Sequence, residues 1–168
     1  MYRIRFHGRG GQGMKTASRI LGSAFLLAGY EVQDAPRYGA ERRGAPIFAY
    51  VRAARQAIQE RGIIREPDLV IVADDSLLPM PAAGVLQGVT PRSVFLIHSG
   101  EAPETWRQRL NIAGPLLILP TEAEQHFVGA ALAGAAARLA GVITRSALED
   151  AVRLELSGLG EEALAANL

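Results

Sequence analysis

A glycine-rich stretch near the start of the chain has the composition of an anion-binding turn. Four glycines fill six positions, with an arginine and a glutamine among them: Gly8-Arg9-Gly10-Gly11-Gln12-Gly13. Glycine adopts backbone angles that a side chain forbids, so several N–H groups can point at one ligand. A helix expected at 14–27 would place its positive N-terminus at the same point. The stretch therefore predicts a cradle for a phosphate-bearing molecule, with a tight turn that binds nothing as the alternative.

A second stretch, after the expected second strand, is dense in charge and glycine. It reads Arg37-Tyr38-Gly39-Ala40-Glu41-Arg42-Arg43-Gly44-Ala45-Pro46. Two adjacent arginines can clamp a phosphate while a neighbouring carboxylate orients one of them. Flanking glycines and prolines favour a fixed backbone over a solvated loop. We therefore expect this loop to have a binding or interface role.

The glycines also match a dinucleotide-binding motif. Gly8-x-Gly10-x-x-Gly13 fits the fingerprint, and Asp34 lies close to where a ribose-binding acid is expected. A stand-alone NAD(P)-binding Rossmann oxidoreductase is therefore an alternative. The phosphate loop of nucleotide triphosphatases fits poorly, because Lys15 follows Gly13 one position too late.

The remaining polar residues do not predict a catalytic or metal site. His7, His98 and His126 lack the spacing of metal ligands. Ser99 lacks the sequence of a nucleophile elbow. Asp74-Asp75 is typical of a strand end that caps the following turn. We expect structural roles for these residues.

The composition excludes several classes of function. A length of 168 residues predicts a single domain, 1–168. Lys plus Arg number 18 and Asp plus Glu 17, which gives no case for a nucleic-acid partner. Without cysteine, a disulfide, a thiolate nucleophile or a Cys-ligated iron–sulfur cluster cannot form within the chain. The start does not resemble a signal peptide and no stretch would span a bilayer, so we expect a cytoplasmic protein without a membrane partner.

Hydrophobic periodicity predicts alternating strands and helices. Strands are expected at 2–7, 30–35, 47–53, 69–73, 93–98 and 116–119. Helices are expected at 14–27, 103–110, 121–141 and 146–156, with a short one at 82–87 and N-caps at Thr121 and Ser146. The first helix and its flanking strands would form a βαβ unit. The fold class is therefore α/β: a Rossmann-like three-layer α/β/α sandwich around a mostly parallel sheet. Ligands of such sheets bind beyond the carboxyl ends of the strands.

Together these motifs resemble the gamma subunit of 2-oxoacid:ferredoxin (or flavodoxin) oxidoreductases, the pyruvate/ketoacid ferredoxin oxidoreductase family. The resemblance lies in Arg5-Phe6-His7-Gly8-Arg9-Gly10-Gly11-Gln12-Gly13, then Val32-Gln33, then Tyr38-Gly39-Ala40-Glu41-Arg42-Arg43-Gly44-Ala45-Pro46. It extends in kind and order over essentially the whole chain and is sharpest in its first third.

The resemblance implies a subunit of an enzyme that converts a 2-oxoacid, coenzyme A and oxidised ferredoxin to acyl-CoA, CO2 and reduced ferredoxin. The family uses thiamine diphosphate and iron–sulfur clusters. This chain has neither cysteine nor a Gly-Asp-Gly thiamine signature, so both cofactors are expected on alpha-, beta- and delta-type partner subunits. The isolated chain is expected not to be catalytic, and ferredoxin or flavodoxin would be reached through the complex. The 2-oxoacid, the acceptor, the stoichiometry and a dimer of the isolated chain stay open.

For this chain the resemblance implies a share in coenzyme A binding and in subunit assembly. The residues expected at the site are Gly8, Arg9, Gly10, Gly11, Gln12, Gly13, Tyr38, Glu41, Arg42 and Arg43. The glycine N–H groups would meet phosphate oxygens, with the charge of Arg9 and the amide of Gln12 nearby. The loop residues would form a second wall, at the ligand or at a neighbouring subunit. A purely structural assembly module is the remaining alternative.

Overall fold

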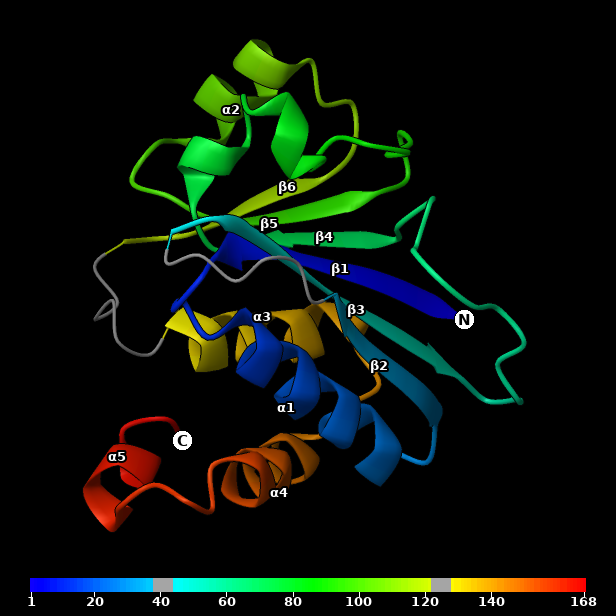
Figure 1. Ribbon diagram of the computed structural model, residues 1–168, viewed down its shortest axis with the longest axis vertical. Helices are drawn as coiled ribbons and strands as arrows, with labels where there is room; N and C mark the ends of the chain where they lie inside the picture. The colour runs from blue at the N-terminus through cyan, green and yellow to red at the C-terminus, as the bar shows by residue number, and fades with distance from the viewer. Residues whose placement is uncertain (38–43, 122–127) are drawn as a thin grey trace.

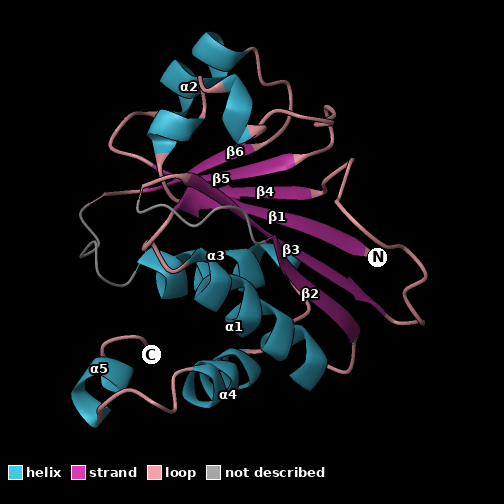
Figure 2. Cartoon of the chain, in the orientation of Figure 1, coloured by secondary structure: helices cyan, strands magenta, loops and turns pink. Residues whose placement is uncertain are grey.

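A six-stranded sheet forms the centre of the molecule (Figures 1 and 2), in a computed structural model that describes all residues except 38–43 and 122–127. Its strands lie in the order β2-β3-β1-β4-β5-β6. They are β1 (Tyr2–Arg9), β2 (Glu31–Arg37), β3 (Pro46–Ala54), β4 (Leu69–Val72), β5 (Val94–His98) and β6 (Leu116–Leu119). Strands β1, β4, β5 and β6 are parallel, whereas β3 is antiparallel to both β1 and β2.

Helices cover both faces of this sheet. They are α1 (Met14–Leu27), α2 (Pro103–Leu110), α3 (Val128–Ala140), α4 (Arg145–Glu155) and α5 (Glu161–Ala165), with short 3-10 turns η1 (Asp75–Leu77) and η2 (Pro81–Ala83). Helices α1 and α3 lie on one face, and α4 packs outside α1; α2 and the 3-10 turns lie on the other (Figure 1). The mostly parallel sheet and its helices confirm the expected fold class. Within the described residues, no helix is long and apolar enough to cross a membrane.

The position of β2 departs from the expected βαβ unit. Strand β2 follows α1 in the chain, but β3 lies between β1 and β2. Strand β3 returns antiparallel beside β2 and pairs with β1 along its whole length, from Tyr2 opposite Ala53 to Arg9 opposite Pro46. Strands β1 and β2 therefore run in the same direction on either side of β3, so the expected βαβ unit is a split one with a hairpin strand between its two strands.

Two local expectations also need correction. Helix α4 is capped by Thr144, whose hydroxyl accepts a hydrogen bond from the Ala147 N–H at 3.2 Å, and Ser146 lies inside the helix. The helix expected at 82–87 is only the short turn η2, which ends where Gly84 takes a left-handed conformation. The capping box expected at Thr121 falls partly outside the described residues, because its Glu124 does.

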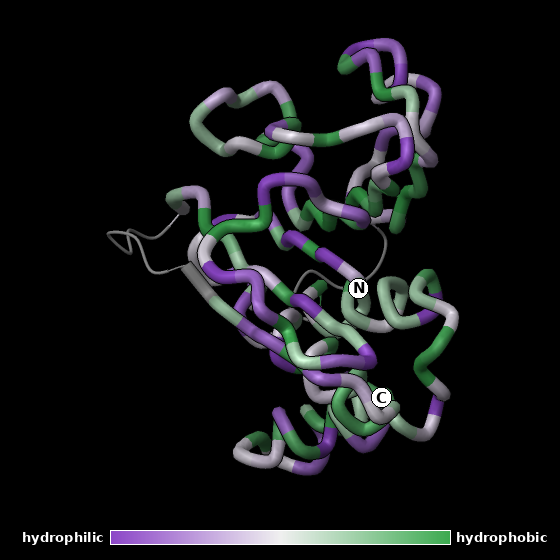
Figure 3. Tube along the Cα trace, turned by 90° about the vertical axis from the view of Figure 1, so that its right-hand side faces the viewer, coloured by the Kyte–Doolittle hydropathy of each residue, from purple (hydrophilic) through white to green (hydrophobic). Residues whose placement is uncertain are grey.

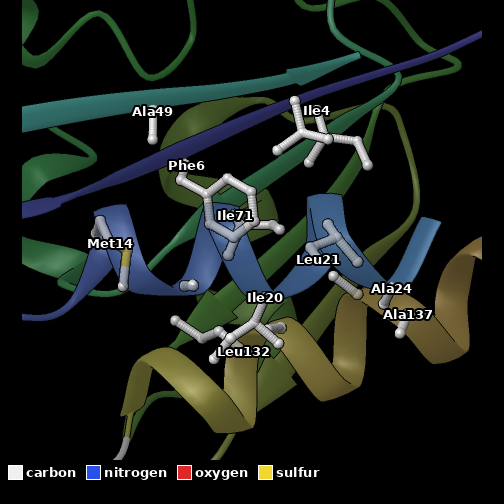
Figure 4. Close-up of a cluster of buried hydrophobic side chains, with 14 of the residues drawn as sticks. Ile4, Phe6, Met14, Ile20, Leu21, Ala24, Ala49, Ile71, Leu132 and Ala137 are labelled. Atoms are coloured by element: carbon white, nitrogen blue, oxygen red, sulfur yellow. The ribbon is translucent and has the colours of Figure 1, made fainter. Parts of the chain in front are cut away.

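The core is divided by the sheet into two hydrophobic clusters. Inward side chains of β1, such as Ile4 and Phe6, pack with Ile20 and Leu21 of α1 and with Leu132 of α3 (Figure 4). On the other face, alternate residues of β4 and β5 pack under η1, η2 and α2; they are Val70, Val72, Phe95 and Ile97. Every residue of β4 is buried, as expected for a central strand covered on both faces.

Small residues bring α3 close to the start of α1. A side chain at Gly129 would place its Cβ 3.0 Å from the carbonyl oxygen of Gly13. Buried Ala133, Ala136 and Ala137 continue this alanine-rich face. Helix α3 therefore begins directly beside the glycine turn. Helix α4 is amphipathic, and its buried Ala151 and Val152 add to the same hydrophobic cluster.

The packing of α3 can be tested with a matched pair of substitutions. We expect Leu132→Ala to lower the free energy of unfolding by about 2–5 kcal/mol, because it removes a fully buried side chain and leaves a cavity. Leu139→Ala, on the same helix but 38% exposed, is the control and should cost less than about 1 kcal/mol. Urea unfolding followed by circular dichroism measures both values. Equal losses would show that α3 does not pack as described.

Candidate functional site

The glycine turn joins the end of β1 to the start of α1 at the carboxyl edge of the parallel strands. Gly11 and Gly13 have φ angles of 97° and 73°, which side chains rarely adopt. The turn is closed by the Gln12 N–H, which donates to the Arg9 carbonyl at 3.0 Å. Gly13 is the N-cap of α1 and provides no side chain to cap the first turn of the helix. The sequence prediction of a strand, a glycine turn and a helix is thus confirmed.

The turn leaves backbone donors available for an anion. No acceptor among the described residues is hydrogen-bonded to the N–H groups of Gly11 and Gly13. The uncapped start of α1 adds the partial positive charge of a helix N-terminus. The start of α3 lies beside this point through the Gly129–Gly13 contact. Backbone donors and the N-terminus of α1 therefore meet at one place on the sheet edge, which suits a phosphate group.

Arg9 holds this turn to two other segments. Its Nε donates to Asp74 Oδ2 at 2.9 Å, its Nη2 to Ser76 Oγ at 2.7 Å, and its Nη1 to the Gly44 carbonyl at 2.9 Å. Asp74 and Ser76 follow β4, and Gly44 precedes β3. The guanidinium therefore connects the ends of three strands, and its charge is shared with Asp74.

Gln12 braces the same connection from inside the turn. Its Oε1 accepts from the Arg9 N–H at 2.7 Å, and its Nε2 donates to Asp74 Oδ2 at 3.2 Å. Burial would raise the pKa of the Asp74 carboxyl, but the hydrogen bond from Ser76 and the charge of Arg9 outweigh it and hold that pKa below its ordinary value. Asp74 also caps η1 by accepting from the Ser76 N–H. Asp74 is thus an ionised anchor for the turn.

The second predicted stretch meets the first at its far end. The Gly10 N–H donates to the Ala45 carbonyl at 3.0 Å, and Gly44 accepts from Arg9. Tyr38, Glu41, Arg42 and Arg43 lie outside the described residues. The structure nevertheless fixes where their segment ends, because Gly44 and Ala45 are hydrogen-bonded to the glycine turn. The two stretches singled out in the sequence therefore share one edge of the sheet.

A family comparison identifies the group of proteins that has this fold. A model described as pyruvate ferredoxin/flavodoxin oxidoreductase matches residues 3–168. The chain belongs to the pyruvate ferredoxin/flavodoxin oxidoreductase family. The expected family is therefore confirmed over nearly the whole sequence.

Two relatives are similar to this chain in sequence, and a third protein shares its fold. The common gamma subunit of the pyruvate/ketoisovalerate oxidoreductases of Pyrococcus furiosus is 35% identical, over 96% of this chain and 91% of its own. The crystal structure of the pyruvate oxidoreductase subunit PORC of Thermotoga maritima has a TM-score of 0.81 at 31% identity, over 99% of this chain and 90% of that one. A 2-oxoglutarate:ferredoxin oxidoreductase from Magnetococcus marinus, solved with coenzyme A and succinyl-CoA bound, shares the fold. Its TM-score is 0.70 at 20% identity, over 99% of this chain and 29% of that one.

The acid of the alternative dinucleotide motif is placed unfavourably in this family member. Asp34 lies on β2, which is separated from β1 by β3. Its Oδ1 accepts from the Ser18 hydroxyl of α1 at 2.9 Å. In dinucleotide-binding folds the second strand lies next to the first, which brings its acid to the glycine turn. The inserted β3 removes that arrangement, so the geometry does not favour the NAD alternative.

The structure adds residues to the site that sequence reasoning did not place there. Asp74, Gly44 and Ala45 hold the glycine turn, and Gly129 brings α3 to it. The sequence showed that Asp74 is an acid at the end of a strand. It did not show that Asp74 pairs with Arg9, because the two residues lie 65 positions apart. No group of three His, Asp or Glu side chains in the described residues is arranged to hold a metal ion.

Two histidines at this edge are buried and each has one unpaired nitrogen. Nδ1 of His7 lies 3.2 Å from the Ala83 carbonyl, and Nδ1 of His98 lies 3.3 Å from the Ala73 carbonyl. Because a carbonyl only accepts, each Nδ1 must be the protonated nitrogen. Each Nε2 is buried without a partner among the described residues. Burial, and then the charge of Arg5, lowers the pKa of His7 to about 3.

The neutral state of His7 makes stability depend on pH. Between its ordinary pKa of 6.5 and about 3, the unfolded chain binds a proton that the folded chain does not. Stability should therefore fall as the pH drops below about 6.5, by about 1.4 kcal/mol per pH unit from this residue. His7→Gln keeps a side-chain donor for the Ala83 carbonyl but cannot ionise. We expect its urea midpoint to change less between pH 7.5 and 5 than that of the wild type. Parallel curves for the two proteins would contradict a neutral buried His7.

Proposed function

We propose that this chain is the gamma-type subunit of a multi-subunit 2-oxoacid:ferredoxin oxidoreductase, in which its glycine turn forms part of a shared coenzyme A site. The enzyme would convert a 2-oxoacid, coenzyme A and oxidised ferredoxin to acyl-CoA, CO2 and reduced ferredoxin. The family membership supports the assignment to this class of enzyme. The observation that carries the role of the site is the hydrogen bonding of both predicted stretches at one sheet edge, beside the start of α1.

The chemistry of this edge fits the phosphate groups of coenzyme A. Coenzyme A carries a pyrophosphate and a 3′-phosphate, and its thiol accepts the acyl group in the overall reaction. The N–H groups of Gly11 and Gly13 would donate to phosphate oxygens. Arg9 and Gln12 would act mainly by holding the turn, since their side chains already bond Asp74. Arg42 and Arg43 would add charge from a segment that ends at the turn.

The other cofactors of the reaction would belong to partner subunits. A Cys-ligated iron–sulfur cluster cannot be held by this chain, which contains no cysteine. Thiamine diphosphate and the clusters would lie on alpha-, beta- and delta-type subunits. The edge with the glycine turn would face those subunits, so that the acyl group forms on their cofactor and meets coenzyme A at a shared boundary. Ferredoxin or flavodoxin would take electrons from the assembled complex.

One observation favours a second candidate, a structural assembly module that binds no small molecule. Arg9 and Gln12 already make five hydrogen bonds within the chain through their side chains and the Arg9 N–H. A turn satisfied in this way is stable without a ligand and can serve as a rigid contact for another subunit. The two candidates predict different effects of the same substitution.

Arg42 and Arg43, which lie outside the described residues, provide the direct test. In the reconstituted complex, Arg42→Ala combined with Arg43→Ala should raise the KM for coenzyme A by about tenfold or more, because charge-assisted hydrogen bonds to a phosphate contribute about 1.5–3 kcal/mol each. The KM for the 2-oxoacid should stay the same. Initial rates over a range of coenzyme A concentrations measure both constants.

A matched control distinguishes the loss of two positive charges from the loss of contacts to coenzyme A. Arg145→Ala combined with Arg153→Ala removes two exposed arginines from α4 and should leave both KM values unchanged. If the loop variant fails to co-purify with its partners but keeps the KM of the remaining complex, the assembly module is supported instead. An unchanged KM with intact assembly would count against both roles for the loop. Fluorescence enhancement of NADH by the purified chain would revive the dinucleotide alternative.

A further inference from the structure

A charged groove lies at the opposite edge of the sheet from the glycine turn. It has a volume of about 800 Å³, opens to solvent, and lies where β1, β4 and β5 begin and β3 ends. This edge of the sheet is on the side of the N-terminus in Figure 1, and that side of the chain faces the viewer in Figure 3. Its charged lining residues are Arg3, Arg52, Arg61, Arg65, Arg92, Glu60, Glu66 and Asp68. Five guanidiniums against three carboxylates give the groove an excess of positive charge.

The base of the groove already holds a carboxylate. Arg3 forks onto Glu60, with Nη2 to Oε1 at 2.5 Å and Nε to Oε2 at 3.1 Å. Arg52 adds a longer contact from Nε to Oε2 at 3.4 Å. The hydrogen bond from Arg3 is the main reason that the pKa of Glu60 lies below its ordinary value. This geometry is that of a planar, bidentate carboxylate site.

Arg3 and Arg52, at the bottom of the groove, are held more firmly than Glu60. Arg52 is only 2% exposed and also donates from Nη2 to the Gly62 carbonyl at 3.0 Å. The backbone of Arg3 is fixed by its N–H bond to Asp68 Oδ2 at 2.8 Å. The Glu60 side chain is 42% exposed and comes from an irregular connecting segment. The guanidiniums are therefore the fixed part of the site, and Glu60 is the part that can be exchanged.

Two guanidiniums at the rim of the groove have no ion-pair partner among the described residues. Arg65 and Arg92 are exposed, and neither side chain has a hydrogen-bond or ion-pair partner among the described residues. Arg61 is held in place because its Nη1 donates to the carbonyls of Ile58 and Glu60. Glu60 is paired with Arg3, so Glu66 and Asp68 are the lining carboxylates left to oppose the charge of these three arginines.

We propose that this groove binds a small organic anion with two or more carboxylate or phosphate groups. One acidic group of the ligand displaces Glu60 from Arg3 and Arg52, and the others reach Arg65 and Arg92. The predominantly polar and charged lining does not suit an apolar ligand. Glu60 acts as an internal competitor, because its carboxylate pairs with Arg3 and Arg52 when no ligand is bound. The groove is separate from the glycine turn, so this proposal does not depend on coenzyme A binding there.

Two substitutions with opposite effects test the proposal on the full chain. The probes are citrate and inorganic pyrophosphate, titrated by calorimetry at constant ionic strength and pH. Arg65→Gln combined with Arg92→Gln should weaken binding at least tenfold. Glu60→Gln should tighten it severalfold, because the base arginines lose their internal carboxylate. Arg138→Gln combined with Arg153→Gln, which removes the same charge from exposed helix positions, should leave the affinity within twofold of the wild type.

Several results would overturn the proposal. Weak, non-saturating heats that follow ionic strength, or equal losses in the groove and control variants, would mean non-specific attraction. An unchanged affinity of Glu60→Gln for the two probes would show that Arg3 and Arg52 do not bind an acidic group of the ligand. Absence of binding to the isolated chain, with Arg65 and Arg92 protected from arginine-specific modification only in the reconstituted complex, would assign the groove to an acidic surface of a partner subunit. None of these results bears on the KM for coenzyme A, so failure here and failure of the proposed function are separable.

Discussion

The position of one guanidinium constrains the whole carboxyl edge of the sheet. Arg9 ends β1, pairs with Asp74 after β4, and donates to the Gly44 carbonyl before β3. Its side chain and that of Asp74 are 28% and 19% exposed, so each charge is partly desolvated and needs the other. A turn made of glycine has almost no side chains with which to hold itself in place. The pair supplies that fixation from outside the turn, and Gln12 adds to it from within.

The position of β3 beside β1 determines which residues lie next to the glycine turn. It moves β2 and Asp34 one strand outward, where the acid bonds Ser18 of α1. It also brings Gly44 and Ala45 to the turn, so that a charged segment ends there. The acid that would meet a ribose hydroxyl in a dinucleotide-binding fold is thereby displaced from the turn. The glycine pattern alone therefore does not decide the chemistry of this edge, because the neighbouring strand differs from that of dinucleotide-binding folds.

Local features of the fold could be predicted from the sequence, whereas its long-range pairings could not. The bounds of α1 and α2 follow from apolar spacing and from breakers such as Gly29 and Pro103, which act within a few residues. The order of the strands depends on pairing between segments far apart, so the place of β3 had no local signal. The partner of Arg9 was hidden for the same reason. The N-cap of α4 was misplaced because Thr144 and Ser146 are both good caps two positions apart, and only the backbone geometry distinguishes them.

The two proposed anion sites, at opposite edges of the sheet, would rely on different physics. At the glycine turn the attraction would come from backbone N–H groups and the N-terminus of α1, whose positions are fixed by the fold and need no side-chain ordering. At the other edge it would come from guanidiniums, of which Arg65 and Arg92 must be ordered by the ligand that they bind. A subunit that shares an active site would benefit from the first type, because the glycine turn keeps its shape before the partner subunits bind. The internal hydrogen bonds of Arg9 and Gln12 would then keep half of the proposed site organised in the isolated chain, so a turn whose side chains are already bonded is compatible with a binding role.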